Sequence, residues 1–148
     1  MNKQTIIIIA AAIFGVLILA AITGTISTST QPTVAIIPIE NIILTQAPQG
    51  IFAATSTSST RVVNWIEQAD QDPTIKAILL EINSPGGSAV ASDEIAQALQ
   101  ATDKPIVAWI RESGASGAYW IASESDHIIA NRMSITGSVG VVASYIGF

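Results

Sequence analysis

The sequence contains no cysteine and only one histidine, His127. The lack of cysteine excludes disulfides, zinc–thiolate sites and a thiol nucleophile. One histidine and dispersed carboxylates do not predict a metal site, and we expect no cofactor. Charged residues are few, at 11%, and the six basic residues are scattered without interleaved aromatics. Nucleic-acid binding therefore has no support, and no nucleic-acid partner is predicted.

The N-terminal region is the longest apolar segment of the chain. Residues 6–22 form an unbroken apolar run of 17 residues, about the shortest that spans a bilayer. Lys3 precedes the run and no other charged side chain occurs before Glu40, which predicts an N-terminus in the cytoplasm. The alternative is a cleaved signal peptide, but the run is long for one and no Ala-x-Ala site follows. We therefore predict a cytoplasmic tip at 1–4, a transmembrane anchor at 5–23, a Ser/Thr-rich linker at 24–33, and a domain outside the cytoplasmic membrane at 34–148.

The rest of the chain alternates short apolar runs with amphipathic stretches. This alternation is typical of an α/β fold, with a parallel or mixed sheet and helical crossovers. The expected strands are 34–39 continuing into 42–44, then 76–82, 105–110, 126–130 and 137–143. The expected helices begin at residues 59 or 60, 88 and 115, and the segment 45–57 is expected to be a loop.

The first glycine motif is Ile-Asn-Ser-Pro-Gly-Gly at 82–87, after an apolar run. Pro85 fixes its own φ and the two glycines allow unusual backbone conformations, so the turn can aim N–H groups into a cleft. Without a side chain at Gly87, an acyl group is expected to approach its amide closely. The alternative is an ordinary turn between a strand and a helix.

The second motif is Gly-Ala-Ser-Gly-Ala-Tyr at 114–119, after the next apolar run. It presents Ser116 among small neighbours at the start of an expected helix. A serine with backbone donors close by is the arrangement that acyl transfer requires. The alternative is that Ser116 merely caps the helix.

The order of these motifs resembles the signal peptide peptidase A (protease IV) family of membrane-anchored serine peptidases. The resemblance runs from about residue 33 to 142 and includes 75–92, Lys-Pro-Ile-Val at 104–107, and Ile-Thr-Gly-Ser-Val-Gly-Val at 135–141. It implies a Clp-protease/crotonase-like fold of repeated ββα units. It also implies Ser116 as the nucleophile and the amides of Gly87 and Gly117 as the oxyanion hole. Peptide or membrane-protein substrates and a homo-oligomer are implied as well.

This interpretation lacks a general base for the serine. The resemblance implies a Ser–Lys dyad whose lysine would lie beyond Phe148, whereas the chain offers Lys3, Lys76 and Lys104. Lys3 is expected on the other side of the membrane, and the other two at strand starts, away from the motifs. His127 is expected on a solvent-facing strand position rather than in a triad.

We therefore interpret the chain as the N-terminal part of a serine endopeptidase domain, incomplete at its C-terminus and inactive alone. Its expected activity in the intact enzyme is the cleavage of peptides such as residual signal peptides. One alternative is a complete but inactive homologue that binds peptides. Another is a crotonase-like acyl-CoA enzyme, against which the anchor and the serine motif argue.

Overall fold

The computed structural model describes residues 2, 4–5, 12–15, 33–46 and 56–141. The chain divides into two units, residues 1–31 and residues 32–148. In the first unit the described residues at 4–5 and 12–15 are helical. No helix among the described residues is long and apolar enough to cross a membrane. The predicted anchor and linker fall mostly on residues outside the description, so the anchor stays a prediction.

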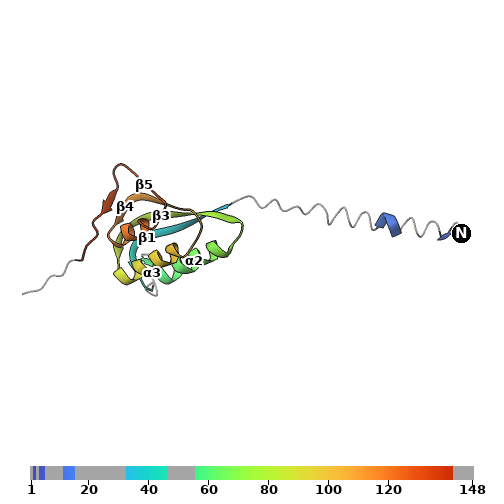
Figure 1. The fold of residues 1–148 in the computed structure, drawn as a ribbon, viewed down its shortest axis with the longest axis horizontal. Helices are drawn as coiled ribbons and strands as arrows, with labels where there is room; N and C mark the ends of the chain where they lie inside the picture. The colour runs from blue at the N-terminus through green and yellow to red at the C-terminus, as the bar shows by residue number, and fades with distance from the viewer. Residues whose placement is uncertain (1, 3, 6–11, 16–32, 47–55, 142–148) are drawn as a thin grey trace, which may run out of the picture. The chain divides into compact units, whose positions relative to one another are not determined.

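The second unit is built on a parallel sheet with helical crossovers (Figure 1). Its described strands run in the order β2-β1-β3-β4-β5, with β6 pairing beside β4. Every recorded pair of strands is parallel. The strands are β1 (Thr33–Leu44), β2 (Ser56–Ser58), β3 (Ile75–Gly87), β4 (Ile106–Ala115), β5 (His127–Ala130) and β6 (Ile135–Gly137), and the helices are α2 (Ser59–Gln71), α3 (Ala89–Gln100) and α4 (Gly117–Ala122).

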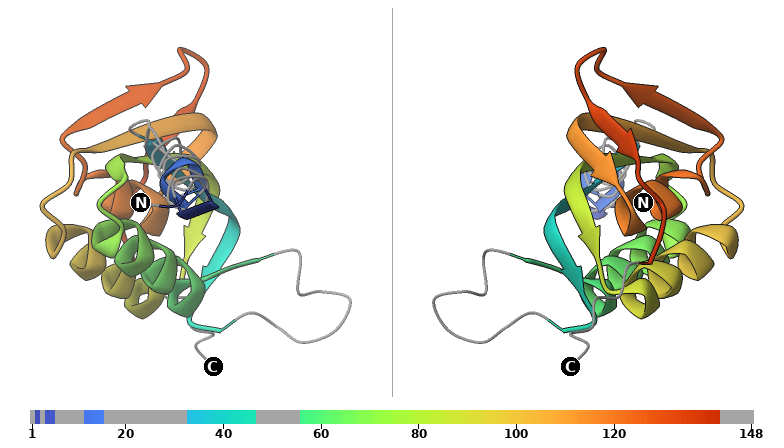
Figure 2. Two further views of the ribbon diagram at one scale, coloured as in Figure 1. Left: turned by 90° about the vertical axis from the view of Figure 1, so that its right-hand side faces the viewer. Right: turned by 90° about the vertical axis from the view of Figure 1, so that its left-hand side faces the viewer.

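The core lies between the sheet and the helices, which cover one face of it (Figure 2). In β3 the side chains of Ile78, Leu80 and Ile82 are buried, while the alternate positions are partly open. This alternation follows from the two-residue period of a strand. Each fully buried isoleucine or leucine side chain stabilises the fold by roughly 1.5–3 kcal/mol. From α2, Val62 and Ile66 complete the same core.

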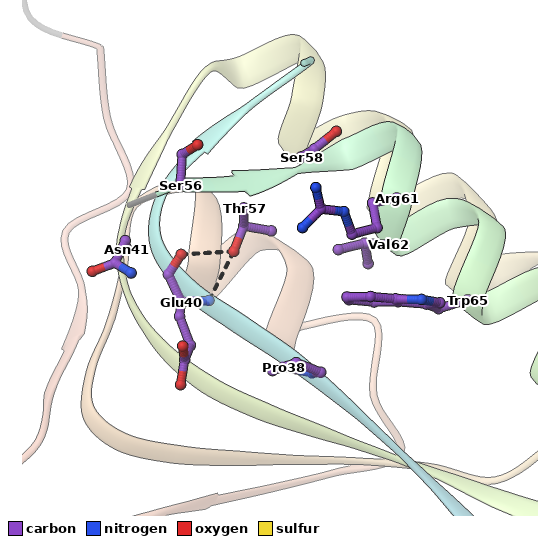
Figure 3. A pocket seen from close by; sticks show the side chains of 9 residues that line it. All are labelled: Pro38, Glu40, Asn41, Ser56, Thr57, Ser58, Arg61, Val62 and Trp65. Carbon is purple, nitrogen blue, oxygen red and sulfur yellow. Dashed lines mark hydrogen bonds between the residues drawn. The ribbon is translucent and has the colours of Figure 1, made fainter. Parts of the chain in front are cut away.

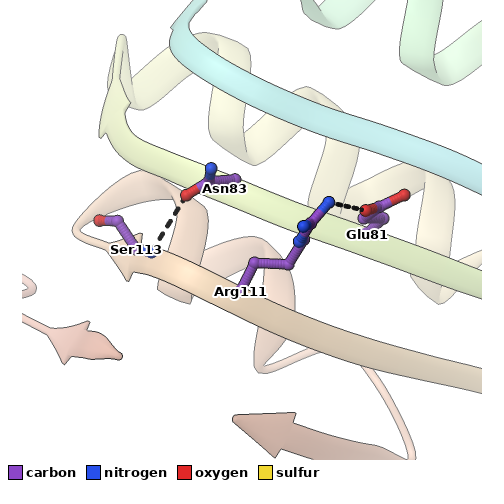
Figure 4. Close-up of polar contacts among 4 residues, drawn as sticks. All are labelled: Glu81, Asn83, Arg111 and Ser113. Atoms are coloured by element: carbon purple, nitrogen blue, oxygen red, sulfur yellow. Dashed lines mark hydrogen bonds and ion pairs between the residues drawn. The ribbon is translucent and has the colours of Figure 1, made fainter. Parts of the chain in front are cut away.

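The opposite face of the sheet carries polar contacts between neighbouring strands (Figure 4). Arg111 on β4 pairs with Glu81 on β3, at 2.7 Å between guanidinium nitrogen and carboxylate oxygen. Its guanidinium also lies 5.3 Å from the ring centre of Trp109. Near the ends of the same strands, the Ser113 N–H donates to Asn83 Oδ1 at 3.2 Å. The Arg111–Glu81 pair and the Ser113–Asn83 bond join β3 to β4 close to the two glycine motifs.

The predicted α/β class is confirmed, and the element boundaries differ in informative ways. The expected strand at 76–82 extends to Gly87, because the glycine turn itself continues the pairing with β1 through Gly86 and Gly87. The end of the expected loop at 45–57 forms β2, a three-residue polar strand without an apolar pattern to reveal it. Where the last strand was expected at 137–143, β6 covers Ile135–Gly137, φ at Gly137 is +82°, and residues 138–141 form no strand; residues 142 and 143 lie outside the described residues.

Candidate functional site

The sheet brings the two glycine motifs together. Parallel strands end at the same edge, and the register pairs Ser84 of β3 with Gly114 of β4. Beyond this pair, Gly86 packs directly against the serine motif. A Cβ atom at Gly86 would lie 2.8 Å from the amide nitrogen of Gly117 and 2.9 Å from Cβ of Ser116. The Pro-Gly-Gly turn and the serine therefore form one site, although Ser116 comes 29 positions after Gly87 in the sequence.

Ser116 lies in an unusual backbone conformation, with φ 53° and ψ −122°. Non-glycine residues avoid positive φ, and such conformations cost on the order of 1–3 kcal/mol and gather at functional sites. The conformation is held by the Ser116 N–H, which donates to the Gly137 carbonyl at 2.7 Å. The side chain makes no capping hydrogen bond to the six-residue helix α4. The alternative of a simple helix cap is therefore not what the structure shows, and Ser116 as a residue is only partly buried.

The glycine at 87 serves a different purpose from the one expected. A Cβ atom at this position would not enter the cleft but would collide with β1, 2.1 Å from the carbonyl oxygen of Ile43. The residue is therefore required by the close approach of β3 to β1. The amide of Gly87 nevertheless lies beside the serine motif, because a Cβ atom at Gly117 would be 3.6 Å from it.

A largely apolar cavity of about 650 Å³ opens over these residues. Its walls come from the glycine turn, the first turn of α3, the serine motif and the segment that follows β6. The lining residues are Gly87, Ala89, Ser92, Asp93, Ser116, Gly117, Trp120, Val139, Gly140 and Val141. Asp93 is the only ionisable residue among them. The cavity is thus lined by Ser116, Gly87 and Gly117 in largely apolar surroundings.

The basic residues considered in the sequence lie elsewhere. His127 is exposed on β5 and pairs with Val107, near the start of β4. Lys76 is exposed at the start of β3. Lys104 precedes β4, and its Nζ donates to the carbonyl oxygens of Ala69 and Asp72. Among the described residues, no lysine or histidine lines the cavity at Ser116.

A second, smaller cavity of about 140 Å³ lies between β1, β2 and α2 (Figure 3). It is lined by Pro38, Glu40, Asn41, Ser56, Thr57, Ser58, Arg61, Val62 and Trp65. The Thr57 hydroxyl donates to the Glu40 carbonyl at 2.6 Å and accepts from the Glu40 N–H at 2.9 Å. Since Thr57 thereby joins the short strand β2 to β1, these contacts have a structural explanation.

Several residues around the site were not singled out in the sequence. Ser84 is fully buried beneath the glycine turn, and Ser92 is buried against Gly117. Asn41 sits in a bulge of β1 with φ 59°. Ser84 could have been found, because it continues the buried alternation of Ile78, Leu80 and Ile82 with a polar residue. Asn41 and Ser92 give no such signal, since their importance depends on which strand or loop lies beside them.

Comparison with known proteins finds peptidases. Residues 98–148 match the model of Peptidase family S49. Protease 4 of Haemophilus influenzae is 35% identical over 118 residues, which cover 78% of this chain and 18% of that protein. A structure titled 1510-N membrane-bound stomatin-specific protease, a lysine-to-alanine mutant in complex with a substrate peptide, is 24% identical with a TM-score of 0.62, covering 78% of this chain and 49% of that one.

The fold is also shared with a different class of enzyme. A member of the enoyl-CoA hydratase/isomerase family is 22% identical with a TM-score of 0.57, covering 72% of this chain and 47% of that one. At this identity the likeness shows the fold alone, and it confirms the expected Clp-protease/crotonase-like architecture. The chain spans about half the length of these solved structures and less than a fifth of the Haemophilus influenzae protein.

Proposed function

Because this chain belongs to the signal peptide peptidase A family of peptidase family S49, we propose that it carries the nucleophile and the oxyanion hole of a serine peptidase. One observation supports this above the others. The Ser116 hydroxyl makes no capping bond, and the residue contacts the Pro-Gly-Gly turn at the base of an apolar cavity. If Ser116 only capped α4 and the glycines only formed a turn, the fold would not need Ser116 at positive φ in contact with Gly86.

In the proposed reaction, Ser116 Oγ attacks the carbonyl carbon of a peptide bond. The negative charge that develops on the carbonyl oxygen is stabilised by the amides of Gly87 and Gly117. Removal of one such donor typically costs about 10²–10³ in rate. A neutral lysine amine takes the serine proton and later protonates the leaving amine. The described residues at the cavity do not supply this lysine, so it comes from a segment or subunit outside them.

The proposed substrates are extended apolar peptides, including residual signal peptides. The apolar lining of the cavity by Trp120, Val139 and Val141 suits apolar side chains. We propose that the peptide lies extended in the cavity beside the Pro-Gly-Gly turn and binds by strand addition. The apolar N-terminal run supports a single-pass anchor in the cytoplasmic membrane with the peptidase domain outside, and we propose a homo-oligomer as in the family.

A second candidate function is a module that binds peptides without cleaving them. The lack of a lysine or histidine among the described residues that line the cavity favours it. The two functions differ in turnover. A peptidase releases new amino termini, whereas a binding module only associates with the peptide.

The test is hydrolysis of fluorogenic apolar peptides by the full-length protein and its Ser116→Ala variant. We expect cleavage that Ser116→Ala abolishes while peptide binding persists. Lys104→Ala is the matched control, since this lysine bonds carbonyls away from the site and its loss should leave the rate unchanged. Cleavage that survives Ser116→Ala would refute the peptidase proposal. Binding without cleavage by the unmodified protein would favour the module.

A further inference from the structure

Ser84 is a buried polar residue to which the proposed chemistry assigns no role. Its side chain is fully buried, in the middle of the Asn-Ser-Pro-Gly sequence. The hydroxyl donates to the Asn41 carbonyl at 2.5 Å and accepts from the Gly86 N–H at 3.1 Å. Both bonds of this hydroxyl are therefore made to backbone, one on β1 and one in the glycine turn.

The second of these bonds reaches the residue that sets the direction of the turn. Gly86 has φ 96°, a conformation that only glycine adopts readily. The orientation of the peptide between Gly86 and Gly87 follows from the dihedral angles of Gly86. This peptide carries the Gly87 N–H, the proposed oxyanion donor. A contact that fixes the conformation of Gly86 therefore also fixes the direction of the Gly87 N–H.

Ser84 is itself held from two neighbouring strands. On β1, Asn41 has φ 59° at the point where the register with β3 shifts, which directs its carbonyl to the Ser84 hydroxyl. On β4, the Ser113 hydroxyl donates to the Ser84 carbonyl at 3.2 Å. After the turn, the Ser88 N–H donates to the Ile43 carbonyl at 2.8 Å. The turn is thus fixed on both sides of Gly86 and Gly87.

We propose that Ser84 is a positioning residue for the oxyanion hole: its hydroxyl locks Gly86 to β1 and so directs the Gly87 N–H at the substrate carbonyl. This inference rests on the proposed peptidase function and deepens it. The hydroxyl touches no substrate, so it acts only through the turn. Its loss affects the transition state, where charge develops on the carbonyl oxygen, more than the binding of the uncharged peptide.

A merely structural serine makes a different prediction. Removing a buried hydrogen-bonded hydroxyl lowers the stability of any protein, with no selective effect on the folded enzyme. Ser59 provides the matched control, because it is equally buried and its hydroxyl donates to Glu94 Oε2 at 2.5 Å, with the Thr45 carbonyl oxygen 3.3 Å away. Neither partner belongs to the glycine turn. Ser59→Ala should thus lower the midpoint of unfolding and leave the kinetics of the folded enzyme unchanged.

The experiment measures kcat and KM of the full-length protein and its variants with an apolar peptide, below their unfolding temperatures. Ser84→Ala should lower kcat about 10- to 100-fold with KM within about two-fold, a fraction of what the loss of an oxyanion donor costs. If Ser84→Ala does not fold, Ser84→Cys, whose thiol is a weaker donor and acceptor, should give an intermediate kcat.

The outcomes separate this inference from the proposed function. Cleavage that survives Ser116→Ala overturns both. If Ser116→Ala is inactive but Ser84→Ala, or Ser84→Cys in its place, keeps the wild-type kcat, only the positioning role is overturned. It is also overturned if Ser59→Ala lowers kcat as much as Ser84→Ala, or if Ser84→Ala acts through KM alone. A selective loss of kcat in Ser84→Ala, with Ser59→Ala unchanged, supports it.

Discussion

Replacing Gly117 with alanine should destabilise the protein through a single contact, with Ser92. The added Cβ would lie 2.1 Å from Ser92 Oγ and 3.1 Å from Ser92 Cβ. The backbone itself does not resist the change, because φ at Gly117 is not positive and the residue begins a helix. The expected loss of stability therefore comes from the close packing of the serine motif against Ser92 of α3.

The magnitude follows from what Ser92 must give up. Its hydroxyl donates to the Ser88 carbonyl at 2.9 Å, and the side chain is almost wholly buried. To avoid the new methyl group the hydroxyl must turn away, which loses a bond worth about 0.5–1.5 kcal/mol. The remaining Cβ–Cβ approach of 3.1 Å adds overpacking, for a total of about 1–3 kcal/mol.

A double-mutant cycle tests this account. Ser92→Ala alone should cost about 0.5–1.5 kcal/mol, the worth of its bond. In the Gly117→Ala background it should cost almost nothing, because the bond is already lost and the obstructing oxygen is removed. Urea unfolding of the four proteins, followed by circular dichroism, gives the free energies of unfolding. Equal costs of Ser92→Ala in both backgrounds, within about 0.5 kcal/mol, would refute the reasoning.

Two further predictions concern other parts of the domain. Gly87→Ala places its Cβ 2.1 Å from the Ile43 carbonyl oxygen. Because a backbone carbonyl cannot rotate away as a side chain can, we expect the free energy of unfolding to fall by about 3 kcal/mol or more, measured as a lower urea midpoint. An unchanged midpoint would contradict the close approach of β3 to β1. The pKa of Asp72 lies below its ordinary value because the side chain and backbone N–H of Thr74 donate to it and Lys104 is near. The ionised carboxylate therefore stabilises the fold at pH values above its ordinary pKa, and this stabilisation is lost as the pH falls through the lowered pKa. The urea midpoint of Asp72→Ala should converge on that of the wild type at low pH. A difference between the two midpoints that stays constant with pH would exclude this linkage.

The fold could be predicted to a large extent from local patterns. The apolar run of β3 and the amphipathic stretch of α3, which begins at Ser88, predicted both elements. The capping bond is present, with Ser88 Oγ accepting from the Ala91 N–H at 3.4 Å. Strand β2 was missed, because it is formed by polar residues whose pairing with β1 depends on Thr57 meeting Glu40.

The structure brings the predicted site residues together, while their catalytic roles stay predictions. Ser116, Gly87 and Gly117 lie together as expected, since parallel strands carry both motifs to one edge of the sheet. The reason for a glycine at 87 was wrong. Its missing side chain makes room for Ile43 on β1, and a partner more than 40 residues earlier cannot be inferred from the motif itself.

The sequence by itself determined the alternation of strands and helices, the apolar core positions and the two motifs that end neighbouring strands. These depend on residue type and on spacing along a few consecutive residues. Only the tertiary structure decided that Ser116 makes no cap, that Gly86 packs on it, and that Ser84 joins the turn to Asn41. Those properties depend on how strands distant in the sequence pack against one another, because the same serine or glycine has a different role when its neighbour in space changes.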